Sequence, residues 1–187
     1  MPSCLRGRFL VAAKGLADPN FFKTVVLIVE HNEQGAMGLV VNRPSSVTVQ
    51  NALSQYFEIP STDDVVYVGG PVEPSALFIL HDAEEMESEC PIVPGLYCGS
   101  SEDVFEDVVR AYAHSEPCSS FRIFSGCAGW APHQVEGEIA RGDWHIMPAS
   151  ADLVLQDDSY EVWDKCLRKI QIANRIMPHT VRNPEWN

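Results

Sequence analysis

The chain has 187 residues, of which 45% are hydrophobic and 21% charged, and 26 Asp and Glu against 13 Lys and Arg give a net charge of −13. This composition supports a hydrophobic core and excludes a disordered chain, a collagen-like fibre and a bundle of membrane helices. The excess of acidic residues repels polyanions, so direct binding of nucleic acid is not expected. We expect one domain over residues 1–187, with an irregular tail from about residue 174.

Short strands and one short helix are predicted in the first half of the chain. The β-branched run at 25–29 and the apolar run at 37–41 flank turn residues, which predicts a β-hairpin over 23–42. Pro44 lacks an N–H group and is expected to block the strand ladder there, and Thr48 is expected to cap a short helix. Further strands are predicted at residues 9–13, 65–68 and 76–80.

Helices and strands alternate in the second half. Ser100 or Ser101 is expected to cap an amphipathic helix, and Gly142 to end a later one that starts near Pro132. The other predicted elements are strands at 95–99, 121–124 and 144–147, and a last helix at about 159–172. Strands that come in runs as well as between helices predict an α+β fold, with antiparallel pairing in the hairpin.

The six cysteines lack the spacings of a metal site. No C-x-x-C, H-x-x-x-H or H-E-x-x-H motif is present, whereas a structural zinc site needs four ligands supplied by such short motifs. We therefore expect no metal and no cofactor. The apolar run at 9–13 is too short for an export signal, and no stretch approaches the roughly 20 apolar residues of a membrane span. The sequence predicts a cytoplasmic protein with reduced thiols and no membrane partner.

Four motifs together resemble the YqgE/AlgH family of bacterial proteins, in an order that covers residues 9 to about 170. They are Glu30-His31-Asn32 with Gly35 to Pro44, Gly69-Gly70-Pro71-Val72, Leu80-His81, and Gly126 to Trp130 with Gln134, Glu136, Glu138 and Trp144. The resemblance implies a mixed, branched β-sheet curled into a pseudo-barrel with helices outside. It also implies no established biochemical activity, although some members carry the label of transcriptional regulator. The sequence departs from the usual family pattern at Cys127, where an aromatic residue is typical.

Two polar loops at strand ends are the first candidates for a ligand site. The residues concerned are Gly69, Gly70 and Pro71 in one loop, and Ser125, Gly126, Gly129 and Trp130 in the other. We expect the second loop to enter a helix, so that outward N–H groups and the helix N-terminus could hold a small anion or a carboxylate. The alternative is that these glycines only permit positive φ angles and close packing. If they form a site, the two loops meet in one groove.

Polar residues of the hairpin form the second candidate. His31 and Asn32 lie at one end of the hairpin and Asn42 and Arg43 close its second strand, so we expect the two pairs to lie near each other. The cluster is either a recognition site or ordinary turn chemistry with a surface arginine. His81, at the end of another strand, has the same two interpretations.

Binding is favoured over catalysis, and no catalytic residue is assigned. Partner recognition, with a protein or a small molecule, fits a domain that has polar strand-end loops but no recognisable catalytic set. The alternative is a hydrolase or transferase that uses His31, His81 or Cys127, with Cys127 as a nucleophile beside a base such as His133 or His81.

Overall fold

The structure is a computed structural model that describes residues 4–54, 56, 63–83, 90–113, 120–155 and 158–176. Its strands are β1 (Arg8–Ala12), β2 (Val25–Asn32), β3 (Gly35–Val40), β4 (Pro44–Thr48), β5 (Val65–Val68), β6 (Val72–His81), β7 (Tyr97–Gly99), β8 (Phe121–Trp130) and β9 (Trp144–Pro148). Its helices are α1 (Val49–Leu53), α2 (Glu102–Ala113), α3 (Gln134–Arg141), α4 (Ala151–Leu155) and α5 (Ser159–Ile176). An irregular tail is predicted from about residue 174, but α5 continues to Ile176, and residues 177–187 lie outside the described part.

The described strands form one mixed sheet that branches at β8. The main path runs β4-β5-β8-β3-β2-β1-β9, and β6 leaves it by pairing with β8 and carries β7. All pairs are antiparallel except β5 with β8, which is parallel. The predicted α+β fold with a mixed, branched sheet and flanking helices is therefore confirmed, but the sheet does not close into a barrel.

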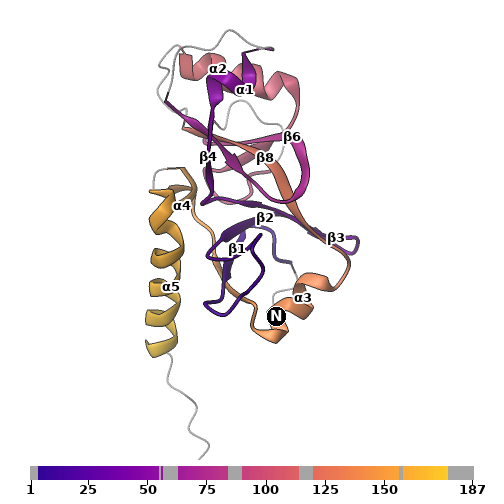
Figure 1. The fold of residues 1–187 in the computed structure, drawn as a ribbon, viewed down its shortest axis with the longest axis vertical. Helices are drawn as coiled ribbons and strands as arrows, with labels where there is room; N and C mark the ends of the chain where they lie inside the picture. The colour runs from indigo at the N-terminus through magenta and orange to yellow at the C-terminus, as the bar shows by residue number, and fades with distance from the viewer. Residues whose placement is uncertain are drawn as a thin grey trace, which may run out of the picture.

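The hydrophobic side chains divide between two clusters. The larger one is built on the continuous β-branched run of β2, whose residues from Val25 to Val29 are all buried, together with β1, β3 and α5. The smaller one lies under α1 and α2 and includes Phe105, Val108 and Ile123. In Figure 1, α1 and α2 lie together at one end of the molecule, and α5 runs along its side.

The two glycine motifs meet where the chain crosses β8. Val68 of β5 pairs with Ser125, and Val72 of β6 pairs with Cys127. Because β5 and β6 both pair with Phe124 and Ser125, they lie on opposite edges of β8, so the segment between them passes from one edge to the other. A Cβ atom on Gly70 would lie 2.2 Å from the carbonyl carbon of Cys127, so only glycine allows this crossing.

Two strand predictions are wrong, for identifiable reasons. The segment from Ser125 to Trp130 is not a loop, because β8 continues through Gly126 (φ 69°) and pairs with β3 at its end. Pro44 does not end the ladder but begins β4, which pairs only with β5 among the described strands. A proline is tolerated at the start of an edge strand, where the missing N–H group breaks no hydrogen bond.

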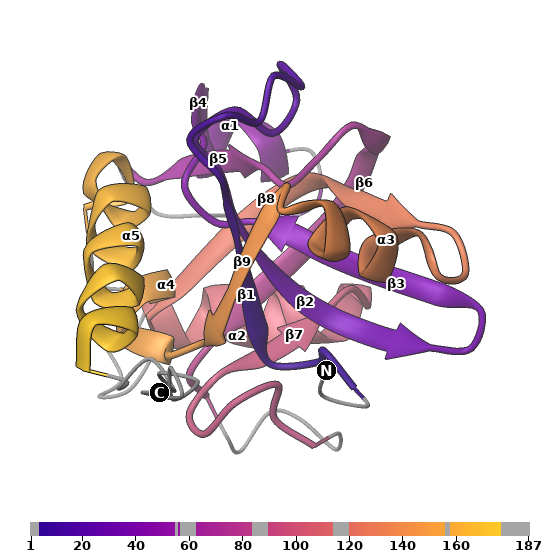
Figure 2. The same ribbon diagram turned by 90° about the horizontal axis from the view of Figure 1, so that it is seen from below.

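The helix after β8 also starts later than predicted. His133 is its N-cap in the left-handed region (φ 63°), α3 begins at Gln134, and Gly142 ends it as expected (φ 85°). The N-terminus of α3 is therefore separated from Gly126 by the end of β8. Seen from below, α3 lies against β3, while β9 runs beside β1 (Figure 2).

We predict that Gly70→Ala lowers the free energy of unfolding by about 2 kcal/mol or more, because its methyl group would overlap the backbone of β8. Urea denaturation measures this change. Gly15→Ala is the matched control, since a Cβ there meets nothing within 4 Å, and its effect should be within about 0.5 kcal/mol. Equal urea midpoints for Gly70→Ala and Gly15→Ala would contradict the close backbone contact at this crossing.

Candidate functional site

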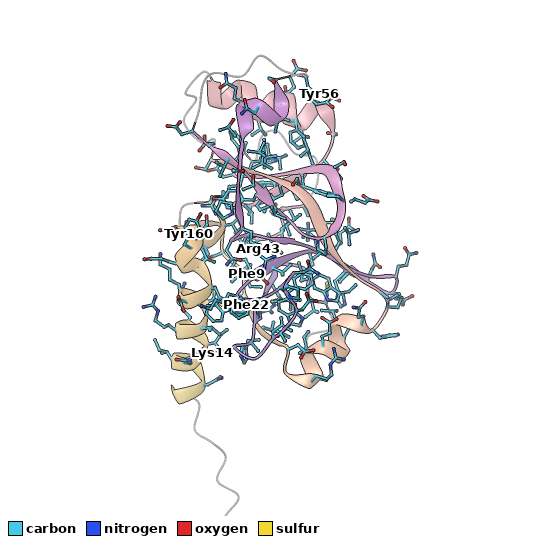
Figure 3. All side chains as sticks on the ribbon, in the orientation of Figure 1. Phe9, Lys14, Phe22, Arg43, Tyr56 and Tyr160 are labelled. Atoms are coloured by element: carbon cyan, nitrogen blue, oxygen red, sulfur yellow. The ribbon has the colours of Figure 1, made fainter. Side chains whose placement is uncertain are left out.

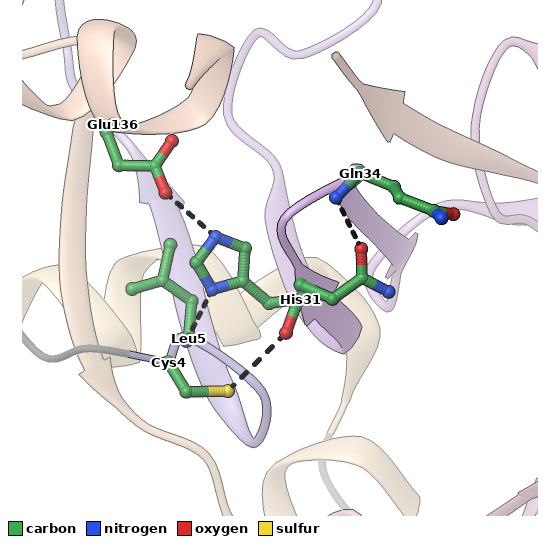
Figure 4. A network of polar contacts seen from close by, with 6 residues as sticks. Cys4, Leu5, His31, Gln34 and Glu136 are labelled. Atoms are coloured by element: carbon green, nitrogen blue, oxygen red, sulfur yellow. Dashed lines mark hydrogen bonds and ion pairs between the residues drawn. The ribbon is translucent and has the colours of Figure 1, made fainter. Parts of the chain in front are cut away.

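His31 is held at both ring nitrogens. Its Nδ1 accepts a hydrogen bond from the Leu5 N–H group at 3.0 Å, so the proton of the neutral ring lies on Nε2, which donates to Glu136 Oε1 at 2.8 Å. Cys4 donates its thiol to the His31 carbonyl (Figure 4). The ring therefore joins the N-terminal segment to β2 and α3, which leaves neither nitrogen free to act as a base.

The Glu136 carboxylate is stabilised in its charged form. A hydrogen bond from its own backbone N–H group lowers its pKa, burial opposes this, and the His31 ring and His133 lower the pKa further. The carboxylate therefore supports the fold most strongly when it is ionised.

A second carboxylate of α3 joins two buried tryptophans. Glu138 Oε2 accepts the indole N–H groups of Trp130 at 2.9 Å and Trp144 at 2.8 Å, and Oε1 accepts from Gln134 at 2.9 Å. Phe21 stacks on Trp130 with a centroid distance of 6.0 Å and meets Trp144 edge-on at 5.5 Å. Trp130, a predicted ligand residue, is only 6% exposed and belongs to the core.

Asn42 and Arg43 fix the loop that carries Phe21. Asn42 Oδ1 accepts from the Val25 N–H group at 2.8 Å, and its Nδ2 donates to the Lys23 carbonyl at 3.0 Å. The Arg43 guanidinium donates to the carbonyls of Pro19 (3.1 Å), Asn20 (2.6 Å) and Phe22 (3.3 Å). Figure 3 shows Arg43 near Phe22.

Arg43 is a structural clamp on that loop. Burial lowers the pKa of its guanidinium, and the carboxylate of Asp18 opposes this effect. An arginine stays protonated under both influences.

The two polar pairs of the hairpin lie at opposite ends of it, so the expected cluster is wrong. Asn32 pairs with Gly35 at the turn, whereas Val26 pairs with Val40 near the open end, where Asn42 follows. Antiparallel pairing brings together residues at equal distances from the turn, not the two ends of a hairpin. Asn32 Oδ1 accepts from the Gln34 N–H group at 2.8 Å, which is turn chemistry.

The groove expected between the two glycine loops is filled by backbone. Gly69 donates its N–H group to the Ser125 carbonyl at 2.8 Å, and a Cβ on Gly126 would lie 2.6 Å from the Gly70 carbonyl oxygen. Pro71 and Gly129 are exposed beside this crossing, and a Cβ on Gly129 would approach no atom closer than 3.6 Å. Close packing accounts for Gly69, Gly70 and Gly126, and ligand binding by the seven loop residues stays a prediction.

His81 and Cys127 are both enclosed. His81 is 0% exposed and stacks on Tyr97 at 5.8 Å between ring centroids. It pairs with Phe121 at the start of β8, whereas Cys127 lies near the other end of that strand. Burial raises the pKa of the Cys127 thiol, and the negative charge of Glu73 raises it further, so the reactive thiolate is disfavoured.

A cavity of about 370 Å³ lies elsewhere, between the two branches of the sheet. We call it the strand-junction cavity. It is lined by residues of β2, β3, β6 and β7, by the start of α2, and by the N-terminal segment, including Arg6, Glu30, Met37, Phe78, Tyr97 and Ser100. A second cavity, of about 220 Å³, lies beside Tyr67 and Arg122. Only the first reaches the usual range of ligand sites, about 300–1,000 Å³.

None of the twelve predicted ligand residues lines the strand-junction cavity. Its residues come from strands, a helix and loops that are far apart in the sequence, so spacing could not bring them together. One signal was present: Ser101 was expected as a helix cap, and its Oγ accepts from the Val104 N–H group at 3.4 Å.

The described residues contain neither a metal-binding group nor a helix that could span a membrane. In the described part of the chain, no three His, Cys, Asp or Glu side chains are grouped to hold a metal ion. Five cysteines are free thiols there, and Cys118 lies outside it. Among the same residues, no helix combines the length and apolar character needed to cross a bilayer.

Comparison with known proteins decides the family. The model of a family described as AlgH-like matches residues 9–175. The chain belongs to the AlgH-like family.

Relatives and solved structures of the AlgH-like family agree with this assignment. A UPF0301 protein of Myxococcus xanthus is 39% identical over 162 residues, 85% of this chain and 87% of the relative. The solution structure of the AlgH protein from Pseudomonas aeruginosa has a TM-score of 0.72 at 31% identity and covers 96% of this chain and 97% of its own. A crystal structure from Corynebacterium diphtheriae has a TM-score of 0.71 at 27% identity, with 87% and 85% covered. The predicted resemblance to the YqgE/AlgH family is confirmed.

We predict that Glu136→Gln destabilises this AlgH-like chain at neutral pH and that the difference disappears in acid. The folded carboxylate has a lowered pKa, so its contribution is present above the unfolded value of about 4.3 and is lost as the pH falls through the folded value. Urea denaturation between pH 3 and 7 measures the difference. Glu33→Gln, in the exposed turn nearby, is the control. If Glu136→Gln lowers the free energy of unfolding by the same amount at every pH, the stabilising role of the ionised carboxylate is contradicted.

We also predict that Cys127 and Cys166 react with iodoacetamide at least about tenfold more slowly than Cys4 and Cys90, because the first two are buried and the last two exposed. Peptide mapping by mass spectrometry after timed labelling gives the four rates. Fastest labelling at Cys127 would restore it as a candidate nucleophile.

Proposed function

We propose that this AlgH-like protein is a non-catalytic, cytoplasmic regulatory domain that binds a small molecule in the strand-junction cavity. The observation that carries the proposal is the cavity itself, whose volume of about 370 Å³ suits a small organic ligand. A ligand there would touch both branches of the sheet and the first turn of α2. Binding of the ligand would therefore change the relative position of the two branches and α2, and with it their recognition by a partner protein.

The lining of the cavity supports binding of an organic molecule. Val29, Met37, Phe78, Tyr97 and Val104 supply apolar and aromatic surface. Charged and hydroxyl groups make the lining more polar than apolar overall, so a ligand with both polar and apolar parts fits it.

The enzyme alternative has less support. His31, His81 and Cys127, the residues proposed for a hydrolase or transferase, do not line the cavity. His31 uses both ring nitrogens within the fold, and the raised pKa of Cys127 disfavours its thiolate. We assign no catalytic residue.

Regulation through a partner protein is more consistent with the charge than direct binding to DNA. The net charge of −13 disfavours contact with phosphates. The regulatory role that the family resemblance implies therefore fits a domain that acts through another protein.

We predict that a screen of small metabolites by thermal shift finds compounds that raise the melting temperature, and that Val104→Trp abolishes the rise. The indole would occupy the cavity that Val104 lines. Val47→Trp is the matched control, because Val47 is 46% exposed on β4 and outside the cavity. Ser100→Phe, at the exposed rim, replaces Val104→Trp if that variant fails to fold. Stabilisation that survives both cavity variants would place the ligand elsewhere and contradict the proposal.

A further inference from the structure

Two side chains of opposite charge face the strand-junction cavity. They are Arg6, from the N-terminal segment, and Glu30, from β2. The backbone places them in the same region, because Leu5 donates its N–H group to the His31 ring and Gly7 donates to the Ile28 carbonyl at 2.9 Å. Arg6 is therefore fixed alongside the part of β2 that carries Glu30.

Neither charge is neutralised by a counter-ion in the described part of the chain. The Arg6 guanidinium donates to the carbonyls of Pro91 at 2.8 Å and Cys90 at 2.9 Å, which are uncharged acceptors. Within the same residues, Glu30 makes no hydrogen bond or ion pair, and the two side chains do not pair with each other. Both side chains are exposed and therefore accessible to water.

A ligand that fills the cavity displaces that water from both charges. Removing a charge from water is costly unless an opposite charge or strong hydrogen bonds replace it. An anion would compensate only Arg6, a cation would compensate only Glu30, and a neutral molecule would compensate neither. A zwitterion compensates both with charge-assisted hydrogen bonds.

We propose that the ligand is a small zwitterion of the amino-acid class with an apolar side chain. Its carboxylate binds Arg6 and its ammonium group binds Glu30, and the hydroxyl groups of Ser100 and Ser101 line the same cavity. Its side chain packs on the apolar wall that includes Phe78 and Tyr97. This inference rests on the proposed function, since it names the ligand class of the same cavity.

Titration calorimetry with three probes tests the ligand class. The probes are L-phenylalanine, 3-phenylpropionate, which lacks the ammonium group, and phenethylamine, which lacks the carboxylate. L-leucine and L-methionine extend the zwitterion set in case the cavity prefers an aliphatic side chain. We expect the best zwitterion to bind at least about tenfold more tightly than either of its singly charged analogues, since each lost ionic hydrogen bond weakens binding by about this factor.

Charge variants assign each end of the ligand. Glu30→Gln should weaken the zwitterion about tenfold and leave its deaminated analogue unchanged, and Arg6→Gln should weaken the zwitterion and leave its decarboxylated analogue unchanged. Glu33→Gln and Arg8→Gln are the controls, because neither residue lines the cavity. If Arg6→Gln loosens the contact with residues 90 and 91 and fails to fold, Glu30→Gln still tests the ammonium end.

The outcomes separate this inference from the proposed function. Equal affinity for the zwitterion and its analogues, or no binding of any zwitterion, overturns the ligand class. If another class of molecule then binds and Val104→Trp blocks it, the cavity is still a ligand site. If no small molecule binds in the screen, both proposals fail.

Discussion

Close contact between two backbones at β8 determines the rest of the structure. The chain crosses from one edge of β8 to the other between Val68 and Val72, and the glycines at positions 69, 70 and 126 remove the side chains that would prevent it. The crossing lets β5 and β6 share one strand, so the sheet branches and its hydrophobic residues form two clusters. The strand-junction cavity lies between those branches, on residues of β2 and β3 on one side and of β6, β7 and α2 on the other.

Polar residues that suggest a ligand site in the sequence serve to hold separate segments of the fold together. His31 attaches the N-terminal segment, which carries Arg6 to the cavity wall, to β2 and α3. Glu138 and Arg43 both support the aromatic group around Trp130, Glu138 through the two indoles and Arg43 through the loop of Phe21. Hydrogen bonds of this kind fix a single arrangement of segments that share little sequence proximity.

Short-range sequence patterns predicted most strands and helices correctly, whereas features that depend on long-range contacts could not be predicted. The β-branched run of β2, the Thr48 cap and the helix end at Gly142 follow from short-range rules and are confirmed. The segment after Ser125 resembles a loop because glycines are rare in strands, but its pairing with β3 makes this segment a strand. The cavity could not be predicted, because Arg6, Glu30 and Ser100 are brought together only by long-range contacts: hydrogen bonds hold the Arg6 segment on β2, and the branch of the sheet carries Ser100.

Chemical-shift mapping tests the central claim most directly. A two-dimensional ¹⁵N–¹H titration of the whole chain with an L-amino acid mixture reports every amide that a ligand affects, without assuming where it binds. The account predicts saturable shifts centred on Glu30, Met37, Tyr97 and Ser100, with the amides at the crossing of β8 unaffected. Saturable shifts centred on Gly70, Gly126 and Gly129 would contradict it, because they would locate recognition at the crossing rather than between the branches.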